Sequence, residues 1–159
     1  MGDLLIREAT AADIPALLPL QKEIHDCHVA HHPEAFHTAD PGEVTAWLQE
    51  RLAGPNFRCF VALDGTEAVG YVCASVVERQ RDTLCNPRRF VDLDQLSVRG
   101  SHRRRGVGRA LVDAVVEFAR KNGIREIQLS VWWGNRVARA FYRNLGFRLV
   151  REYYQRRVE

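Results

Sequence analysis

The hydrophobic residues of this chain follow two spacings in turn, one typical of strands and one typical of helices. Apolar runs predict strands at residues 4–9, 59–63, 68–77, 90–98, 127–131 and 147–157. Apolar positions three and four residues apart predict helices at residues 12–27, 41–52, 107–121 and 138–145. Asp64 and Gly65, between the second and third runs, are a hairpin signal. The order of these elements predicts a mixed α/β fold with helices layered on one sheet.

Length and composition are those of a single folded unit. With 159 residues, of which 46% are hydrophobic, the chain can bury one core. No proline-rich or serine-rich linker divides it, so we expect one domain over residues 1–159. The first residues lack the apolar run of a signal peptide, and no stretch approaches the roughly 18 apolar residues that span a membrane. We therefore expect a soluble, cytoplasmic protein without a membrane partner.

Charge and cysteine usage narrow the function classes. A net charge of +3, from 23 basic and 20 acidic residues, is too mild to indicate a nucleic-acid-binding module. No Cys-x-x-Cys pair occurs, and Cys59 and Cys73 lie in predicted strands, where a thiol packs as a small hydrophobic group. Disulfides and a zinc site are both disfavoured.

The positive charge gathers between a predicted strand and a predicted helix, in the run Arg103-Arg104-Arg105-Gly106-Val107-Gly108-Arg109. The first N–H groups of a helix have no partners within the helix, and they carry the positive end of its dipole. Gly106 and Gly108 remove side chains that would block an anion, while Arg103 can contact phosphate oxygens through two hydrogen bonds. The run therefore predicts a phosphate-binding turn, and a basic turn with helix-packing glycines is the alternative.

Two motifs in fixed order connect the chain to a known family. The first is Arg103-x-x-Gly106-x-Gly108, preceded by Leu96-x-Val98, and the second is Asn135-x-x-Ala138-x-x-x-Tyr142-x-x-x-Gly146-Phe147. With both, the chain resembles the GNAT superfamily of acyl-CoA-dependent N-acyltransferases over about residues 58–150. It departs from the family after Val98, where a proline often follows. The resemblance implies a twisted, mostly antiparallel sheet with splayed central strands and helices on both faces.

The resemblance also implies a reaction and a co-substrate. It implies transfer of an acetyl group from acetyl-CoA to a primary amine of a small molecule or protein, by direct attack in a ternary complex and without a metal. Main-chain groups of Leu96 and Val98 would bind the pantetheine arm, and the N–H of Leu96 would polarise the thioester carbonyl. The other implied CoA-binding residues are Arg103, Arg104, Arg105, Gly106, Val107, Gly108, Arg109, Asn135, Ala138 and Tyr142.

Proton transfer requires an acid and a base, because an amine is almost wholly protonated at neutral pH. Asp92 and Asp94 match the two positions at which family members carry a glutamate base. Strand alternation places both on the face of Leu96 and Val98, and Asp94 is preferred as the one nearer the thioester. Alternatively, the aspartates bind a basic substrate or pair with an arginine. Tyr142 matches the acid that protonates the CoA thiolate, with core packing as its alternative.

Several polar and aromatic residues leave the acceptor and the partners open. Asn135 either contacts pantetheine or caps the following helix. Five histidines lie close together in the sequence: His25, His28, His31, His32 and His37. They contact the substrate or relay protons, or they are solvated surface residues, and a metal site is the less favoured alternative. Acceptor-wall candidates are Phe36, Trp47, Tyr153 and Tyr154, for each of which ordinary core packing is the favoured alternative. Homodimer-interface candidates are Trp132, Trp133, Tyr153 and Tyr154.

Charge near the strand aspartates gives no single answer about the acceptor. Asp92, Asp94 and Glu78 suit a cationic amine, whereas an acidic acceptor is favoured by Arg79, Arg81, Arg88 and Arg89. Two other functions compete with the enzyme, a non-catalytic acyl-CoA-binding sensor and a nucleic-acid-binding module. Retention of Tyr142 and the two aspartates argues against the sensor, and the mild net charge argues against the nucleic-acid module.

Overall fold

The computed structural model of the protein describes residues 4–158. The chain divides into two compact units, Met1–Leu129 and Ser130–Glu159, and each has its own architecture. None of the helices within residues 4–158 has the length and apolar composition needed to cross a membrane.

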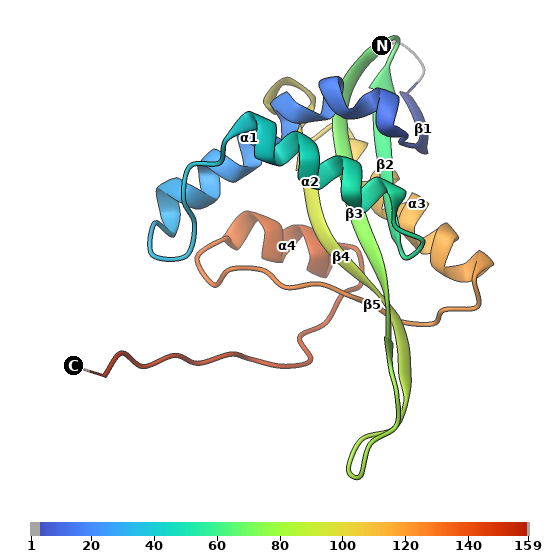
Figure 1. Ribbon diagram of the computed structural model, residues 1–159, viewed down its shortest axis with the longest axis vertical. Coiled ribbons are helices and arrows are strands. Elements are labelled where there is room, and N and C mark those ends of the chain that lie inside the picture. Colours follow the sequence, from blue (N-terminus) through green and yellow to red (C-terminus); the bar gives the residue numbers. More distant parts are fainter. Residues whose placement is uncertain (1–3, 159) are drawn as a thin grey trace. The chain divides into compact units, whose positions relative to one another are not determined.

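The first unit is built on one five-stranded sheet with the order β1-β2-β3-β4-β5. Its strands are β1 (Leu4–Glu8), β2 (Phe57–Asp64), β3 (Glu67–Arg79), β4 (Arg88–Val98) and β5 (Ile127–Gln128). The first four pair in antiparallel fashion, and β5 runs parallel to β4. The β3–β4 hairpin runs well past the helices as an extended arm (Figure 1).

Helices cover both faces of this sheet, as the sequence predicts. The helices α1 (Ile14–His31) and α2 (Pro41–Ala53) lie on one face, and α3 (Val107–Lys121) lies on the other (Figure 1). The Ser97 hydroxyl of β4 donates to the Leu20 carbonyl of α1 at 3.1 Å. Two short 3-10 turns, η1 (Ala11–Asp13) and η2 (Gly100–His102), precede α1 and α3.

Local capping explains where the first helices begin. The Asp40 carboxylate accepts hydrogen bonds from the N–H groups of Gly42 and Glu43, and Pro41 fills the first position of α2, where no N–H is needed. Before α1, Thr10 and Asp13 form a capping box around η1. The Arg7 guanidinium binds the same Asp13 carboxylate at 2.6 Å, which ties β1 to this turn.

The core of the first unit lies on both sides of β2 and β3. Leu17, Leu20 and Leu48 from α1 and α2 are each 1% exposed and pack with the strand residues of their face. On the opposite face, Gly70 of β3 lies directly under α3. A Cβ at this position would lie 2.9 Å from the Ser97 carbonyl oxygen and 3.2 Å from a Leu111 methyl group. The missing side chain lets α3 approach the sheet closely.

The second unit contains α4 (Arg136–Asn144), which starts at the N-cap residue Asn135. No strand is assigned to residues 147–158, so the predicted last strand is not found within this unit. Side chains such as Leu149 and Val150 are 70% and 83% exposed, so no packed face stabilises a strand there. The predicted strand at 127–131 is also shortened, to β5, because its ladder with β4 comprises only two register pairs.

Candidate active site

A β-bulge in the middle of β4 sets the geometry of the site. Cys73 of β3 pairs with Gln95, but the next residue, Ala74, pairs with Leu93. Asp94 is therefore the extra residue of the bulge. A bulge interrupts the alternation of side chains along the strand. Even-numbered residues after Asp94 therefore point to the opposite face of the sheet from even-numbered residues before it.

This bulge corrects one expectation from the sequence. Asp92 pairs with Ser75, and the Ser75 hydroxyl accepts a hydrogen bond from Arg51 of α2, so Asp92 faces α1 and α2. Val98 instead pairs with Gly70, whose face lies under α3, and Leu96 shares that face. Asp92 thus lies on the face opposite to the side chains of Leu96 and Val98, because simple alternation does not hold across a bulge.

The main-chain groups of Leu96 and Val98 point to the edge of β4 that faces away from β3. The N–H of Arg99 donates to the Val69 carbonyl of β3 at 2.8 Å, and successive groups along a strand alternate between its two edges. Hence the groups of Leu96 and Val98 point away from β3. On that side, the described part of β5 pairs with β4 only as far as Asp92. Within the first unit as described, no strand pairs with this edge of β4 beyond the bulge.

The connection from β4 to α3 forms the predicted turn. Arg104 and Gly106 have positive φ angles of 64° and 85°, and Gly106 is the N-cap residue of α3. Backbone that alternates between right-handed and left-handed conformations gathers N–H groups into a concave anion site. Arg99 follows Val98 where the family often has a proline, and η2 comes directly after it. In η2, the Nε2 atom of His102 lies 3.3 Å from the Asp64 carboxylate on β2. This contact anchors the turn to the β2–β3 hairpin.

The first turn of α3 supplies further N–H groups. The first α-helical hydrogen bond runs from the Ala110 N–H to the Gly106 carbonyl at 3.0 Å. The N–H groups of Val107, Gly108 and Arg109 therefore come before the helix's own ladder of hydrogen bonds. Together with the helix dipole, they make the start of α3 suitable for an anion.

The arginines of the turn divide into two groups. Arg103 is engaged elsewhere, since its guanidinium lies 2.7 Å from Glu23 of α1 and its Nε donates to the Val98 carbonyl at 3.0 Å. Arg104, Arg105 and Arg109 are exposed, and none of them forms an ion pair within residues 4–158. Within the described residues, the positive charge of the turn that no acidic side chain pairs is therefore that of these three arginines.

The two strand aspartates differ in their surroundings. Burial raises the pKa of Asp92 above its usual value, and the neighbouring Asp94 carboxylate raises it further, while Arg79 and Arg51 oppose this shift. Asp94 is more exposed, and one of its oxygens accepts a hydrogen bond from the Arg51 guanidinium at 3.0 Å. Asp92 is therefore the carboxylate whose environment favours proton uptake.

Sequence reasoning did not find Arg51, which organises this face. Its guanidinium lies 5.1 Å from the centroid of the Trp47 ring and 4.6 Å from that of Phe57, so two aromatic rings hold it in place. The same Nη2 atom reaches both Ser75 and Asp94. The spacing of Trp47 and Arg51 on one helix face is common in helices. Only the packing of α2 on the sheet shows which residues Arg51 contacts.

In the second unit, Tyr142 and Asn135 have defined local roles. Burial raises the pKa of Tyr142 to about 12, so its hydroxyl keeps its proton at neutral pH. Its ring lies 5.1 Å from Phe141 and 5.6 Å from Phe147, measured between centroids. The Asn135 side chain accepts a hydrogen bond from the Ala138 N–H at 3.0 Å, so Asn135 caps α4.

The histidines surround an aromatic side chain. His28 stacks on Phe36 with 5.0 Å between ring centroids, and the His25 ring hydrogen-bonds with the His37 carbonyl at 2.8 Å. Burial and the neighbouring histidines lower the pKa of His28. Within residues 4–158, no group of three or more histidine, cysteine or acidic side chains is arranged to hold a metal ion. This arrangement is that of a packed segment around Phe36.

Comparison with known proteins identifies the class. The model of the Acetyltransferase (GNAT) family matches residues 20–147, so the chain belongs to this family. An L-2,4-diaminobutyric acid acetyltransferase of Shouchella clausii is 33% identical over 87 residues, covering 55% of this chain and 45% of that protein. An aminoglycoside N(6')-acetyltransferase type 1 of Salmonella typhimurium is 28% identical over 118 residues, covering 73% and 74% of the two chains. The chain thus spans less than half the length of the first relative.

Solved structures share the fold. A mutant of the BH1408 protein of Bacillus halodurans has a TM-score of 0.92 at 24% identity, with 98% of this chain and 99% of that chain covered. The aminoglycoside N-acetyltransferase AAC(6')-Iy in complex with CoA has a TM-score of 0.80 at 22% identity, with 99% and 97% covered. These likenesses confirm the expected mixed sheet with helices on both faces.

Proposed function

We propose that this protein transfers an acetyl group from acetyl-CoA to a primary amine of a small molecule. One observation carries the proposal: the edge of β4 at Leu96 and Val98, beyond the last pair with β5, leads directly into the positive-φ turn at the start of α3. This arrangement suits a ligand with an amide-bearing arm and a phosphate end. Relatives named for diaminobutyrate and aminoglycoside acetylation favour a small-molecule amine over a protein.

The co-substrate binds mainly through the backbone in this proposal. The pantetheine amides add to the β4 edge as a short extra strand, and the pyrophosphate lies against the N–H groups of residues 104–109. The Leu96 N–H donates to the thioester carbonyl and stabilises the negative charge that develops there during attack. Arg104, Arg105 and Arg109 add positive charge around the phosphates.

Asp92 is the base that we favour, in place of Asp94. An oxygen of Asp94 is occupied by Arg51, whereas the burial of Asp92 favours the protonated form that a base must reach. The amine loses a proton to Asp92, directly or through one water, and the neutral nitrogen attacks the thioester carbon. Asp94 stays a fixed carboxylate that orients Arg51 and attracts the cationic amine.

The carbon–sulfur bond breaks as the amide forms, and the leaving CoA thiolate takes up a proton. The family resemblance assigns this proton to Tyr142, whose raised pKa keeps the hydroxyl protonated and able to donate. The family model spans residues 20–147, which include parts of both compact units. We therefore propose that the two units belong to one catalytic domain.

Calorimetric titration tests the co-substrate site. We expect saturable binding of acetyl-CoA, weaker binding of dephospho-CoA and the weakest binding of pantetheine, because each loses phosphate contacts. Arg104→Met should weaken the binding of acetyl-CoA and leave the binding of pantetheine unchanged. Arg143→Met on α4, which loses the same charge, is the control. The absence of binding at millimolar acetyl-CoA would contradict the proposal. Binding without turnover on any amine would identify an acyl-CoA sensor instead.

A further inference from the structure

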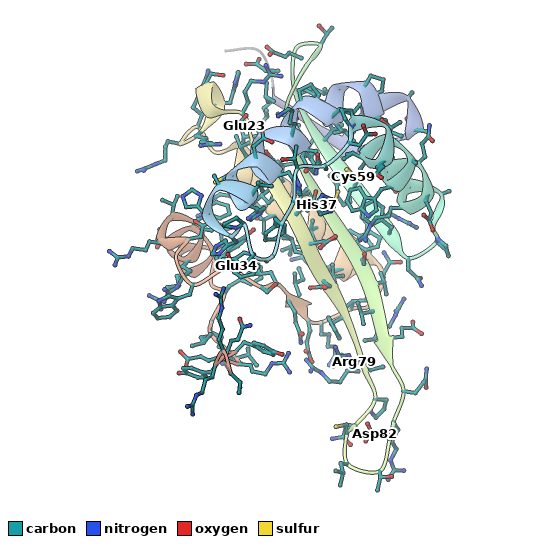
Figure 2. All side chains as sticks on the ribbon, turned by 60° about the vertical axis from the view of Figure 1, so that its left-hand side comes forward. Glu23, Glu34, His37, Cys59, Arg79 and Asp82 are labelled. Atoms are coloured by element: carbon teal, nitrogen blue, oxygen red, sulfur yellow. The ribbon has the colours of Figure 1, made fainter. Side chains whose placement is uncertain are left out.

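The face that carries Asp92 also carries a cation that has no acidic partner among residues 4–158. The residues Ser75, Val77 and Arg79 alternate on β3, and their β4 partners are Asp92, Phe90 and Arg88. Since directly paired residues of an antiparallel ladder point to the same side, Arg79 lies on the face of Asp92. Figure 2 shows Arg79 on the β3–β4 arm, between the body of the unit and the tip at Asp82.

The arginines of this arm differ in their partners. Arg88 pairs with Glu126 at 2.6 Å, and Arg89 pairs with Glu78 at 2.9 Å. The side chain of Arg79, by contrast, forms no ion pair or hydrogen bond with the described residues. Both guanidiniums lie over the Phe90 ring, that of Arg79 at 5.7 Å from its centroid and that of Arg88 at 5.4 Å. Its charge is close enough to lower the pKa of Asp92. Arg79 is therefore an exposed guanidinium that contacts an aromatic ring on the same face as the carboxylate that we assign as base.

A positive and a negative side chain thus lie at different positions along the same face of the β3–β4 ladder. Phe90 and Asp92 are successive residues on one face, which places them about 7 Å apart along the strand. A guanidinium over Phe90 and a carboxylate at Asp92 form a cation and an anion separated by the length of a small molecule. Arg79 would repel the second ammonium of a polyamine, but it can bind a carboxylate through two parallel hydrogen bonds.

We propose that the acceptor carries a carboxylate beside its reactive amine, and that Arg79 binds this carboxylate while Asp92 receives the amine. The substrate class is therefore that of amino acids with a second amino group, rather than polycationic amines. This inference rests on the proposed acetyltransferase function and adds the recognition of the acceptor. Arg79 is a specificity-determining residue and takes no part in proton transfer.

Pairs of acceptors that differ only in a carboxylate measure the contribution of that carboxylate to kcat/KM. Each diamino acid has a decarboxylated counterpart of the same chain length: 2,4-diaminobutyrate with 1,3-diaminopropane, ornithine with putrescine, and lysine with cadaverine. Initial rates of CoA release are measured for every pair at one acetyl-CoA concentration. At least one diamino acid should have a kcat/KM about tenfold or more above that of its diamine, as expected for a charge-assisted hydrogen bond.

Variants then assign the preference to Arg79. Arg79→Met should lower kcat/KM for the preferred diamino acid by about tenfold to a hundredfold, through KM, and leave its diamine unchanged or slightly improved. Arg79→Lys should recover part of the loss, because it keeps the charge without the paired geometry. Arg81→Met, an exposed arginine beyond the last pair of the β3–β4 ladder, is the control and should change neither acceptor.

The outcomes separate this inference from the proposed function. If no amine is acetylated although acetyl-CoA binds, the proposed function fails. Two results would contradict the carboxylate site and leave the proposed acetyltransferase function intact. One is a kcat/KM for diamines or aminoglycosides equal to that for diamino acids, and the other is an equal effect of Arg79→Met on both members of a pair.

Discussion

At the scale of single residues, Asp92 and Asp94 show how two carboxylates on one strand acquire different chemistry. They are separated by one residue, but Asp94 is the bulge residue and reaches Arg51, while Asp92 is more deeply placed beside Ser75. The ion pair of Arg51 and Asp94 is partly exposed, so it contributes only about 0–1 kcal/mol to stability. Its main effect is on the charge that surrounds Asp92.

The pH dependence of acetyl transfer tests this division. A base must be deprotonated, so the rate should fall as the pH drops through the raised pKa of Asp92. Asp94→Asn removes a neighbouring negative charge and should move this acid limb to lower pH, whereas Arg51→Met should move it to higher pH. Asp92→Asn should lower kcat about a hundredfold. A profile of kcat against pH for the four proteins is the measurement.

Thermal unfolding provides the control for these variants. The pKa of Asp92 is raised in the folded protein, so its charged form opposes folding above that pKa, and stability falls as the pH rises through it. Asp92→Asn should therefore not lower the Tm at pH 7, and any rate loss is chemical. A loss of kcat in Asp94→Asn equal to that in Asp92→Asn would place the base at Asp94 instead.

At the scale of elements, the approach of α3 to the sheet depends on Gly70. In Gly70→Ala the new Cβ would lie 2.9 Å from the Ser97 carbonyl oxygen, which is backbone and cannot move freely. We expect a loss of about 1–3 kcal/mol in unfolding free energy and weaker acetyl-CoA binding, because the start of α3 moves from the β4 edge. Urea unfolding and calorimetry measure the two effects.

Gly134→Ala is the matched control for this substitution. A Cβ at Gly134 meets nothing within 4 Å, so its unfolding free energy should stay within about 0.5 kcal/mol of the parent protein. A Gly70→Ala variant as stable as Gly134→Ala would show that α3 does not need this close approach.

The elements also show what the sequence can predict. The strand, the glycine turn and the helix at residues 90–121 follow from local spacing and were predicted close to their observed bounds. The bulge at Asp94 was not, because it depends on how β3 and β4 pair across the sheet. For the same reason Arg51 was missed, since its contacts come from the packing of α2. The prediction of a last strand at residues 147–157 was wrong, because an apolar pattern forms a strand only where a partner edge is present.

At the scale of the whole molecule, the family assignment joins motifs from both compact units, the turn at Gly106 from the first and the segment from Asn135 to Tyr142 from the second. Their order along the chain was sufficient to predict the family. The identity of the acceptor was not predictable from the sequence, because the recognition that we propose depends on which charged side chains lack ion-pair partners in the folded chain, as Arg79 does within residues 4–158.

The central claim, acetyl transfer from acetyl-CoA to an amine, is tested most directly by observing both products together. The protein is incubated with acetyl-CoA carrying a ¹³C-labelled acetyl group and a mixture of diamino acids and diamines, and NMR follows the labelled carbonyl while a thiol reagent follows free CoA. We predict that an N-acetyl amide and free CoA appear in equal amounts, at a rate proportional to protein concentration. Free CoA with labelled acetate and no amide would show hydrolysis, and that result would contradict the account.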